Sequence, residues 1–318
     1  MLACQKYREA GDLWGPAHEK VVLQHLEEDG HLIMQPKIDG MRCMFSEGVP
    51  RSRSWKPLSN LGLQQFAREY MRETDGLDGE VVSGHSYDPY TFRESMSGIR
   101  AAGGSREFTF YAFDIFNLNN SYHVRRLTLE RHIESMGEVV TGPAYSAKIV
   151  LCPQTIVYGL NEIYDEEVRL LAAGWEGGII RRPSQPYKYG RSTALGGALT
   201  KVKRRNTEDA VVTGYEQRFQ NQNEARVSEL GYTTRSAHQE NLVPLEMLGA
   251  LHIRLLDSGI EAKCGVFRGL THEDLRTLWQ ERETLPGRHC EVSVDSATGG
   301  YDSVRTPVWF RWREAEEF

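Results

Sequence analysis

The hexapeptide Lys37-Ile38-Asp39-Gly40-Met41-Arg42 stands at the end of a short strand-like run, Leu32–Lys37. The pattern predicts a strand that ends near the lysine, and Gly40 permits a tight turn directly after it. A lysine amine is a nucleophile only when it is unprotonated, a form that burial or nearby positive charge favours. Alone, the hexapeptide also fits an ordinary charged surface turn, so its companions along the chain decide its meaning.

Further stretches combine strand-like runs with charged or aromatic side chains. In Leu77–Val82 a turn is expected to place Glu80 at a strand start, and Glu176 precedes the strand-like run Gly178–Arg181. Leu199–Lys203 alternates, which puts Lys201 and Lys203 on one face. The remaining companions are Ser52–Leu58, which contains Arg53, and the aromatic run Phe110–Phe116, which contains Phe113 and Asp114.

The fold class predicted from these patterns is α+β with antiparallel sheets, because short strands alternate with amphipathic helices. The spacing of Leu63, Phe66, Ala67, Tyr70 and Met71 is that of a helix with one apolar face. After Arg205 the chain offers several short strands and one helix, with a capping box at Thr271–Asp274, which suits a small OB-fold barrel. The expected domains are 1–205 and 206–318, and the polar stretch 217–241 is expected to be a long loop.

Composition bounds the function. The chain of 318 residues carries a net charge of −6, which argues weakly against a nucleic-acid partner. Every charged residue from Arg181 to Arg205 is nevertheless basic, so this region is either a phosphate-binding surface or a solvated basic face. The five cysteines form no C-x-x-C pair, which argues against a zinc site. With no apolar run of about 18 residues and no signal peptide, we expect a cytoplasmic protein with no membrane contact.

Taken in order, these stretches resemble the motifs of the covalent nucleotidyltransferases and, within them, of the ATP-dependent DNA ligases. Lys37–Arg42 is similar to the family's K-x-D-G-x-R motif, and the remaining matches follow at comparable spacing over nearly the whole chain. They are Arg53 in S-R, Glu80 in D-G-E, Phe113-Asp114 in F-D, Glu176-Gly177 in E-G and Lys201-x-Lys203 in K-x-K. Lys188–Thr193 resembles a segment of the small viral and phage members of the family. The resemblance implies a nucleotidyltransferase domain, ATP-grasp-like in its antiparallel sheets and helices, followed by an OB-fold domain.

The resemblance also implies roles for individual residues. Lys37 becomes covalently linked to AMP, and Asp39, Glu176, Lys201 and Lys203 complete the catalytic set. ATP is held by Arg42, Glu80, Phe113, Glu176, Lys201, Lys203 and Arg313, and Mg²⁺ (or Mn²⁺) by Glu176 and Glu80. Arg53 and Arg191 grip the 5′-phosphate of the DNA. Asp114 is expected to be a local structural acid. The family's last motif continues with a basic residue after the arginine, and Glu314–Phe318 contains none.

The function so implied is an ATP-dependent DNA ligase that seals 3′-hydroxyl/5′-phosphate nicks in duplex DNA, with nicked DNA and ATP as partners and a monomeric state. The stretch 217–241 resembles in its place the DNA-encircling latch of the minimal viral ligases. Two alternatives stay open at this point. One is an RNA ligase or a GTP-dependent mRNA capping enzyme, which shares the lysine nucleophile. The other is a non-catalytic module that binds nicked DNA.

Overall fold

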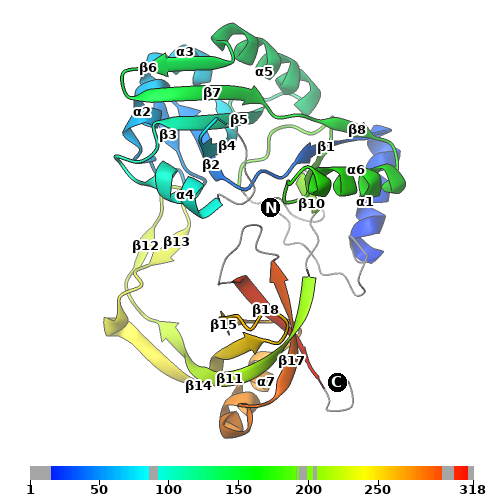
Figure 1. The fold of residues 1–318 in the computed structure, drawn as a ribbon, viewed down its shortest axis with the longest axis vertical. Helices are drawn as coiled ribbons and strands as arrows, with labels where there is room; N and C mark the ends of the chain where they lie inside the picture. Colours follow the sequence, from blue (N-terminus) through cyan, green and yellow to red (C-terminus); the bar gives the residue numbers. More distant parts are fainter. Residues whose placement is uncertain are drawn as a thin grey trace. The chain divides into compact units, whose positions relative to one another are not determined.

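The computed structural model describes residues 16–85, 92–190, 192, 199–202, 206–295 and 304–313. The chain divides into two compact units, Met1–Arg204 and Arg205–Phe318, called here the N-terminal and the C-terminal unit. Figure 1 shows the elements of both units.

The larger sheet of the N-terminal unit has six strands, and their sequence order is strongly interleaved. Their spatial order is β3 (Val49–Arg51), β2 (Met41–Ser46), β4 (Leu77–Ser83), β5 (Glu107–Ile115), β7 (Tyr145–Leu151) and β6 (Val139–Gly142). All neighbours are antiparallel except β5 and β7. The helices of this part are α2 (Leu61–Glu69), α3 (Met71–Thr74), α4 (Phe92–Arg100) and α5 (Tyr122–Met136).

Aromatic side chains fill the core between this sheet and its helices. The rings of Phe45 and Phe110 meet edge to face with 5.0 Å between centroids, and Phe66 of α2 packs edge-on against Phe45 at 5.8 Å. Leu63, Phe66 and Ala67 are fully buried, which confirms the first part of the predicted apolar face, but the helix ends at Glu69, and Met71, in the next helix, is exposed. Asn60 caps the helix by accepting a hydrogen bond of 2.9 Å from the Leu63 amide.

The smaller sheet of the N-terminal unit has four antiparallel strands, in the order β10 (Leu199–Val202), β9 (Gly178–Arg181), β1 (Leu32–Pro36) and β8 (Thr155–Val157). Two helices, α1 (Pro16–Asp29) and α6 (Leu160–Ala172), supply apolar side chains to a core that also contains Leu32 and Met34. Because strand side chains alternate, Gln35 points to the opposite face, where the register aligns it with Ile179 and Lys201. That opposite face belongs to the cavity described below.

The C-terminal unit is built on a second six-stranded sheet with one helix against it (Figure 1). The strand order is β15 (Glu261–Cys264), β14 (Leu242–Leu255), β11 (Asn206–Asn221), β17 (His289–Asp295), β18 (Arg305–Trp312) and β16 (Val266–Phe267). The helix α7 (His272–Gln280) begins at the predicted capping box, in which Thr271 and Asp274 exchange hydrogen bonds, and a 3₁₀ turn, η3 (Arg282–Thr284), follows it. Its side chains Leu275 and Leu278 are buried in the core of this unit, so the mixed α+β class is confirmed in both units.

The polar stretch 217–241 is not the loop expected from its composition. Strands β11 and β14 stay paired as far as Asn221 and Leu242, and a small hairpin of β12 (Ala225–Val227) and β13 (Thr233–Arg235) continues outward, before the 3₁₀ turn η2 (Gln239–Asn241). Its side chains are mostly exposed, so hydrogen bonds rather than an apolar core hold the strands together. Such a two-stranded ribbon needs no apolar residues, which is why its sequence looks like a loop.

Two further observations concern the cysteines and the helices. Cys43, Cys152, Cys264 and Cys290 are buried and not joined in disulfides, while Cys4 lies outside the described residues. Within the described part of the chain, each helix is too short or too polar to cross a membrane.

Candidate active site

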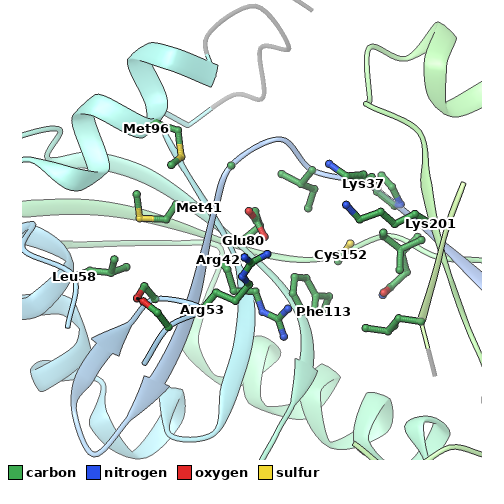
Figure 2. Close-up of a pocket in the computed structure, with 18 of the residues that line it drawn as sticks. Lys37, Met41, Arg42, Arg53, Leu58, Glu80, Met96, Phe113, Cys152 and Lys201 are labelled. Atoms are coloured by element: carbon green, nitrogen blue, oxygen red, sulfur yellow. Dashed lines mark hydrogen bonds between the residues drawn. The ribbon is translucent and has the colours of Figure 1, made fainter. Parts of the chain in front are cut away.

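A cavity of about 720 Å³ in the N-terminal unit is lined by residues from both sheets. It brings together six of the side chains singled out from the sequence, namely Lys37, Arg42, Arg53, Glu80, Phe113 and Lys201. Figure 2 shows Lys37 and Lys201 in the same part of the cavity, with Glu80 and Arg42 close together in another part. The cavity therefore combines cationic side chains, a carboxylate and an aromatic ring.

Lys37 follows directly after β1 and is fixed by the backbone on both sides. Its amide donates to the Gly177 carbonyl at 2.8 Å, and its own carbonyl accepts from the Glu176 amide at 3.3 Å. This exchange brings the Lys37 ammonium against the Glu176 carboxylate, and the two side chains form an ion pair with 17% and 10% of their surfaces exposed. The lysine, which lines the cavity, is thus paired with an acid far away in the sequence.

Gly40 serves a purpose other than the one expected. Its φ is not positive, so no left-handed turn requires a glycine here. A Cβ atom at this position would instead lie 2.8 Å from the Val81 carbonyl oxygen and 2.9 Å from the side chain of Glu80. Gly40 is needed because the backbone after Lys37 passes close to β4, and this contact holds the hexapeptide beside the carboxylate of Glu80.

Arg42 of β2 is held in place by two partners. Its Nε donates to Asp78 at 2.6 Å, and a second bond from the guanidinium to the same carboxylate makes the pair bidentate. The Tyr187 hydroxyl donates to Asp78 at 2.7 Å and accepts from Arg42 at 3.2 Å. Burial lowers the pKa of Arg42, but the Asp78 carboxylate outweighs it, so the pKa is raised and the group stays charged.

Glu80 lies in the middle of β4, so the turn expected before it is absent. The register between β4 and β5 shifts at Asp78 and Gly79, which forms a bulge. A Cβ at Gly79 would lie 2.4 Å from the ring of Phe110 and 2.5 Å from the Tyr111 carbonyl oxygen. The glycine is therefore a packing requirement of the sheet, not the sign of a turn.

The carboxyl of Glu80 sits in an environment that favours its neutral form. Burial raises its pKa to about 7, although the positive charges of Arg42 and Lys37 oppose the shift. The negative charges of Asp78 and Asp39 add to it. Asp39 is itself buried and is not among the residues that line the cavity.

Phe113 presents its ring to the cavity between two guanidinium groups. The Arg42 guanidinium carbon lies 5.2 Å from the ring centroid, and that of Arg181 lies 5.1 Å from it. These are cation–π distances, and they restrict the orientation of the ring. Phe110, the core alternative on the same strand, is fully buried in the aromatic core.

Asp114, the residue after Phe113, accepts hydrogen bonds from two arginines. Arg125 donates to it at 2.7 and 3.1 Å, and Arg181 donates at 2.8 Å. The three side chains are almost completely buried, and Arg181 also donates to Gln35 at 2.6 Å. The expectation that Asp114 is a structural acid agrees with this network, which supports the wall of the cavity behind Phe113.

Arg53 reaches the cavity from a tight turn after β3. The turn is closed by hydrogen bonds of 2.8 Å from the Trp55 amide to the Ser52 carbonyl and from the Ser52 amide to the Lys56 carbonyl. Trp55 adopts a φ of 67°, in the left-handed region that side chains rarely occupy. The Arg51 guanidinium donates to the Trp55 carbonyl at 3.1 Å, which helps to hold this conformation.

The remaining predicted residues have different outcomes. Lys201 lines the cavity from β10, whereas Lys203 and Arg191 lie outside the described residues. Arg313 belongs to the C-terminal unit, where it donates to Asp209 at 2.7 Å and its guanidinium lies 3.7 Å from Glu291.

Three further lining residues with long polar side chains had no role predicted from the sequence: Gln35, Arg100 and Arg181. For Gln35 and Arg181 the sequence contained a usable pattern. Side chains alternate along a strand, so Gln35 lies on the same side as Lys37, and Arg181 lies on the same side as Ile179. No comparable signal marks Arg100, which ends α4 and enters the cavity only through the tertiary fold.

Among the described residues, no group of three or more His, Cys, Asp or Glu side chains is arranged so that it could hold a metal ion. Glu80 lines the cavity, and Glu176 is paired with a residue that does. Mg²⁺ commonly takes only one or two protein carboxylates and completes its shell with substrate phosphates and water. The two acids therefore fit a magnesium ion that enters with a nucleotide better than one held by the protein alone.

Similarity to known proteins is found at the level of three-dimensional structure alone. No protein-family model matches the chain, and a search of curated protein sequences finds no match. A structure from a study of Lig E DNA ligases is 17% identical and covers 90% of this chain and 93% of its own, with a TM-score of 0.60. The structure named Pmar-Lig_PreS3 is 18% identical, with coverage of 91% and 65% and a TM-score of 0.65. The adenylated DNA ligase of Chlorella virus is 20% identical over 98% of both chains, with a TM-score of 0.49. With the first two similarities as its basis, we conclude that this chain has the mixed α+β fold of the DNA ligases.

Proposed function

We propose that the chain is an ATP-dependent DNA ligase that seals nicks through a covalent AMP on Lys37. The observation that carries the proposal is the single cavity in which Lys37, Lys201, Arg42, Glu80 and Phe113 meet. A protein that only bound nicked DNA would not require a half-buried lysine paired with a carboxylate in a cavity that also holds an aromatic ring. The ligase fold makes nick sealing a more direct interpretation than RNA ligation or mRNA capping.

In the first step the Lys37 amine attacks the α-phosphorus of ATP. A nitrogen–phosphorus bond forms, the bond to the bridging oxygen breaks, and pyrophosphate leaves. The amine must lose its proton before or during the attack, and the Glu176 carboxylate that pairs with it is in position to accept that proton. Lys201, joined by Lys203, stabilises the charge that develops on the phosphate oxygens.

The nucleotide is recognised by the part of the cavity that contains Phe113, Arg42 and Glu80. The adenine stacks on Phe113, whose ring is held by Arg42 and Arg181. Glu80 and Arg42 contact the ribose. Glu176 and Glu80 would hold Mg²⁺ (or Mn²⁺), which, when bound, supplies positive charge to the phosphates.

The later steps move AMP to DNA and close the strand. The 5′-phosphate of the nick, gripped by Arg53 and Arg191, attacks the phosphorus of the lysyl-AMP, and the Lys37 nitrogen leaves. The 3′-hydroxyl then attacks the 5′-phosphorus and expels AMP, which completes the phosphodiester bond. Arg53 is well placed for this, because it lines the same cavity as Lys37 while its side chain stays exposed.

The two units divide the work in this proposal. The N-terminal unit is the adenylyltransferase domain, and the curved sheet of the C-terminal unit is an OB-fold that binds the duplex. The ribbon beyond the core of this unit is a latch that contacts DNA. The base of its outer hairpin is held by Asn223, which donates to the carbonyls of Ser236 and His238 at 3.0 and 2.8 Å, and the hairpin carries the exposed cation Arg226.

One experiment tests the central assignment. Purified protein is incubated with Mg²⁺ and labelled ATP or GTP, and the modified peptide is mapped. We expect labelling from ATP, on Lys37, and none after Lys37→Ala, while the variant still binds nicked DNA. Labelling that persists in this variant, or that requires GTP, contradicts the proposal, and a comparison of nicked DNA with nicked RNA separates it from an RNA ligase.

A second experiment tests the latch. Replacement of residues 220–238 by a short turn should weaken binding to nicked DNA, because it removes the exposed ribbon but leaves the core of the C-terminal unit intact. Formation of lysyl-AMP should continue at the wild-type rate. Unchanged affinity for DNA would show that the ribbon has another role.

A further inference from the structure

Four aromatic side chains form a continuous row next to the cavity, and the proposed reaction as described above does not use them. Trp55 meets Phe116 edge to face at 5.7 Å, Phe116 meets Tyr187 at 6.2 Å, and Tyr187 meets Tyr189 at 5.1 Å between ring centroids. We call these four residues the aromatic row. The row connects three segments that are far apart in the sequence: the turn after β3, the end of β5 and the loop after β9.

Tyr187 is the member of the row that reaches the cavity side chains. Its hydroxyl donates to Asp78 at 2.7 Å and accepts from Arg42 at 3.2 Å. Burial raises the pKa of this hydroxyl well above its usual value, with a further contribution from the Asp78 carboxylate, so it stays protonated and remains a donor. The hydroxyl thus belongs to the group that fixes Arg42 beside Phe113.

The ring of Tyr187 has a different set of neighbours. Through Phe116 it supports Trp55, whose strained backbone closes the turn that carries Arg53. Tyr189 ties the loop to the same point, because its hydroxyl donates to the Phe116 carbonyl at 2.5 Å. Loss of the ring contacts would therefore change the position of the turn that carries Arg53. Loss of the hydroxyl would change the position of the Arg42 side chain.

We propose that Tyr187 is a positioning residue with two separable parts, resting on the ligase function proposed above. Its hydroxyl positions Arg42 for the nucleotide, and its ring positions Arg53 for the phosphate of the DNA. One side chain thus positions the arginine that contacts ATP and the arginine that contacts nicked DNA. A tyrosine suits this position because its hydroxyl contacts Arg42 and Asp78, while its ring contacts Phe116 and Tyr189. A side chain with only a ring, or only a hydroxyl, would make one of these two sets of contacts.

The test separates the two half-reactions. Lysyl-AMP formation is measured with labelled ATP at several concentrations, and strand closure is measured on a nick that already carries the 5′-adenylate. Tyr187→Phe keeps the ring and should lower lysyl-AMP formation about tenfold at low ATP, mainly through KM, since both hydrogen bonds between the hydroxyl and the Arg42–Asp78 pair are lost. Closure of the adenylated nick should stay within twofold of wild type.

Phe116→Leu should give the opposite pattern. It weakens the ring contacts but leaves the hydroxyl of Tyr187 on Asp78, so closure of the adenylated nick should fall several-fold while lysyl-AMP formation is preserved. Tyr187→Leu, which removes both parts, should impair both reactions. Thermal unfolding of each variant confirms that it is folded before rates are compared.

Tyr145→Phe is the matched control. The Tyr145 hydroxyl also donates to a carboxylate, that of Glu69, and Tyr145 is not among the residues that line the cavity. Both half-reactions should be unchanged in this variant. Equal losses in both half-reactions for Tyr187→Phe and Phe116→Leu, or no loss in either, would overturn the inference. If the wild-type protein forms no lysyl-AMP, the proposed function has failed, and this inference fails with it.

Discussion

Arg181 on β9 donates a hydrogen bond of 2.8 Å to Asp114 on β5, so a buried ion pair joins the two sheets of the N-terminal unit. Asp114 also accepts two bonds from Arg125 at the start of α5. Both arginines are deeply buried, which means that loss of the acid leaves two positive charges without their partner in the interior. The position of Arg181 beside Phe113 therefore depends on the Asp114 carboxylate, whereas that of Arg42 depends on Asp78.

Asp114→Ala should destabilise the protein by about 3–5 kcal/mol, because removal of one partner leaves buried charge uncompensated. Urea denaturation followed by tryptophan fluorescence measures the change. Glu138→Ala is the control, since Glu138 is 76% exposed and its contact with Lys148 is 3.4 Å long. That variant should lose no more than about 1 kcal/mol, as is usual for surface pairs. Similar losses in both variants would contradict the role given to Asp114.

Glu80→Gln should stabilise the protein at alkaline pH. Between the ordinary pKa of a glutamate, 4.5, and the raised value of about 7, the folded protein holds a proton that the unfolded chain releases. Stability therefore falls as the pH rises through this window, and the penalty is complete above about pH 7. Glutamine carries no such penalty, so its advantage in melting temperature should be clear at pH 8 and should shrink towards pH 5.

Thermal unfolding at several pH values between 5 and 8 measures this difference. Glu134→Gln, on the exposed side of α5, serves as the control and should give a difference that does not change with pH. If Glu80→Gln also differed from wild type by a constant amount, the carboxyl would not have the raised pKa described here.

Gly79→Ala should cost about 1–3 kcal/mol, because its Cβ would overlap the ring of Phe110 in a packed core. Chemical denaturation measures the loss. Gly103→Ala is a suitable comparison, since a Cβ there meets no atom within 4 Å and the backbone has no positive φ. A stable Gly79→Ala variant would mean that the bulge between β4 and β5 can shift to make room.

Lys201→Ala should slow lysyl-AMP formation by about 100-fold or more, because it removes a preorganised positive charge from the phosphate region. Rapid-quench measurements with saturating labelled ATP give the rate of this step. Lys20→Ala changes an exposed lysine of α1 and should leave the rate unchanged. A loss confined to ATP affinity, with the maximal rate intact, would indicate that Lys201 serves binding alone.

Much of this fold follows from local patterns. Leu63, Phe66 and Ala67 predicted the buried face of α2, and Thr271 with Asp274 predicted the start of α7, because periodicity and capping act within a few residues. The strand β9 was predicted with its observed bounds, Gly178–Arg181, from a run of β-branched residues next to glycines.

Contacts between distant segments were not predictable in this way. Gly40 and Gly79 were both interpreted as turn residues, whereas each is a glycine because another strand or ring passes close to it. The partners of Asp114 lie 11 and 67 residues away, and nothing in the sequence around it indicates them. The stretch 217–241, which holds the end of β11 and the hairpin of β12 and β13, was interpreted as a loop, because strands with both faces in water lack the apolar alternation on which strand prediction depends.

The ion pair between Lys37 and Glu176 has a consequence for the resting protein. An ammonium group has no lone pair, so while it keeps its salt bridge this side chain does not react with the acyl phosphates, isocyanate and aldehydes that modify exposed amines in cells. The pairing therefore protects a side chain that must be highly reactive once per turnover. Glu176→Gln removes this protection, so Lys37 should be carbamylated faster by cyanate in the absence of nucleotide.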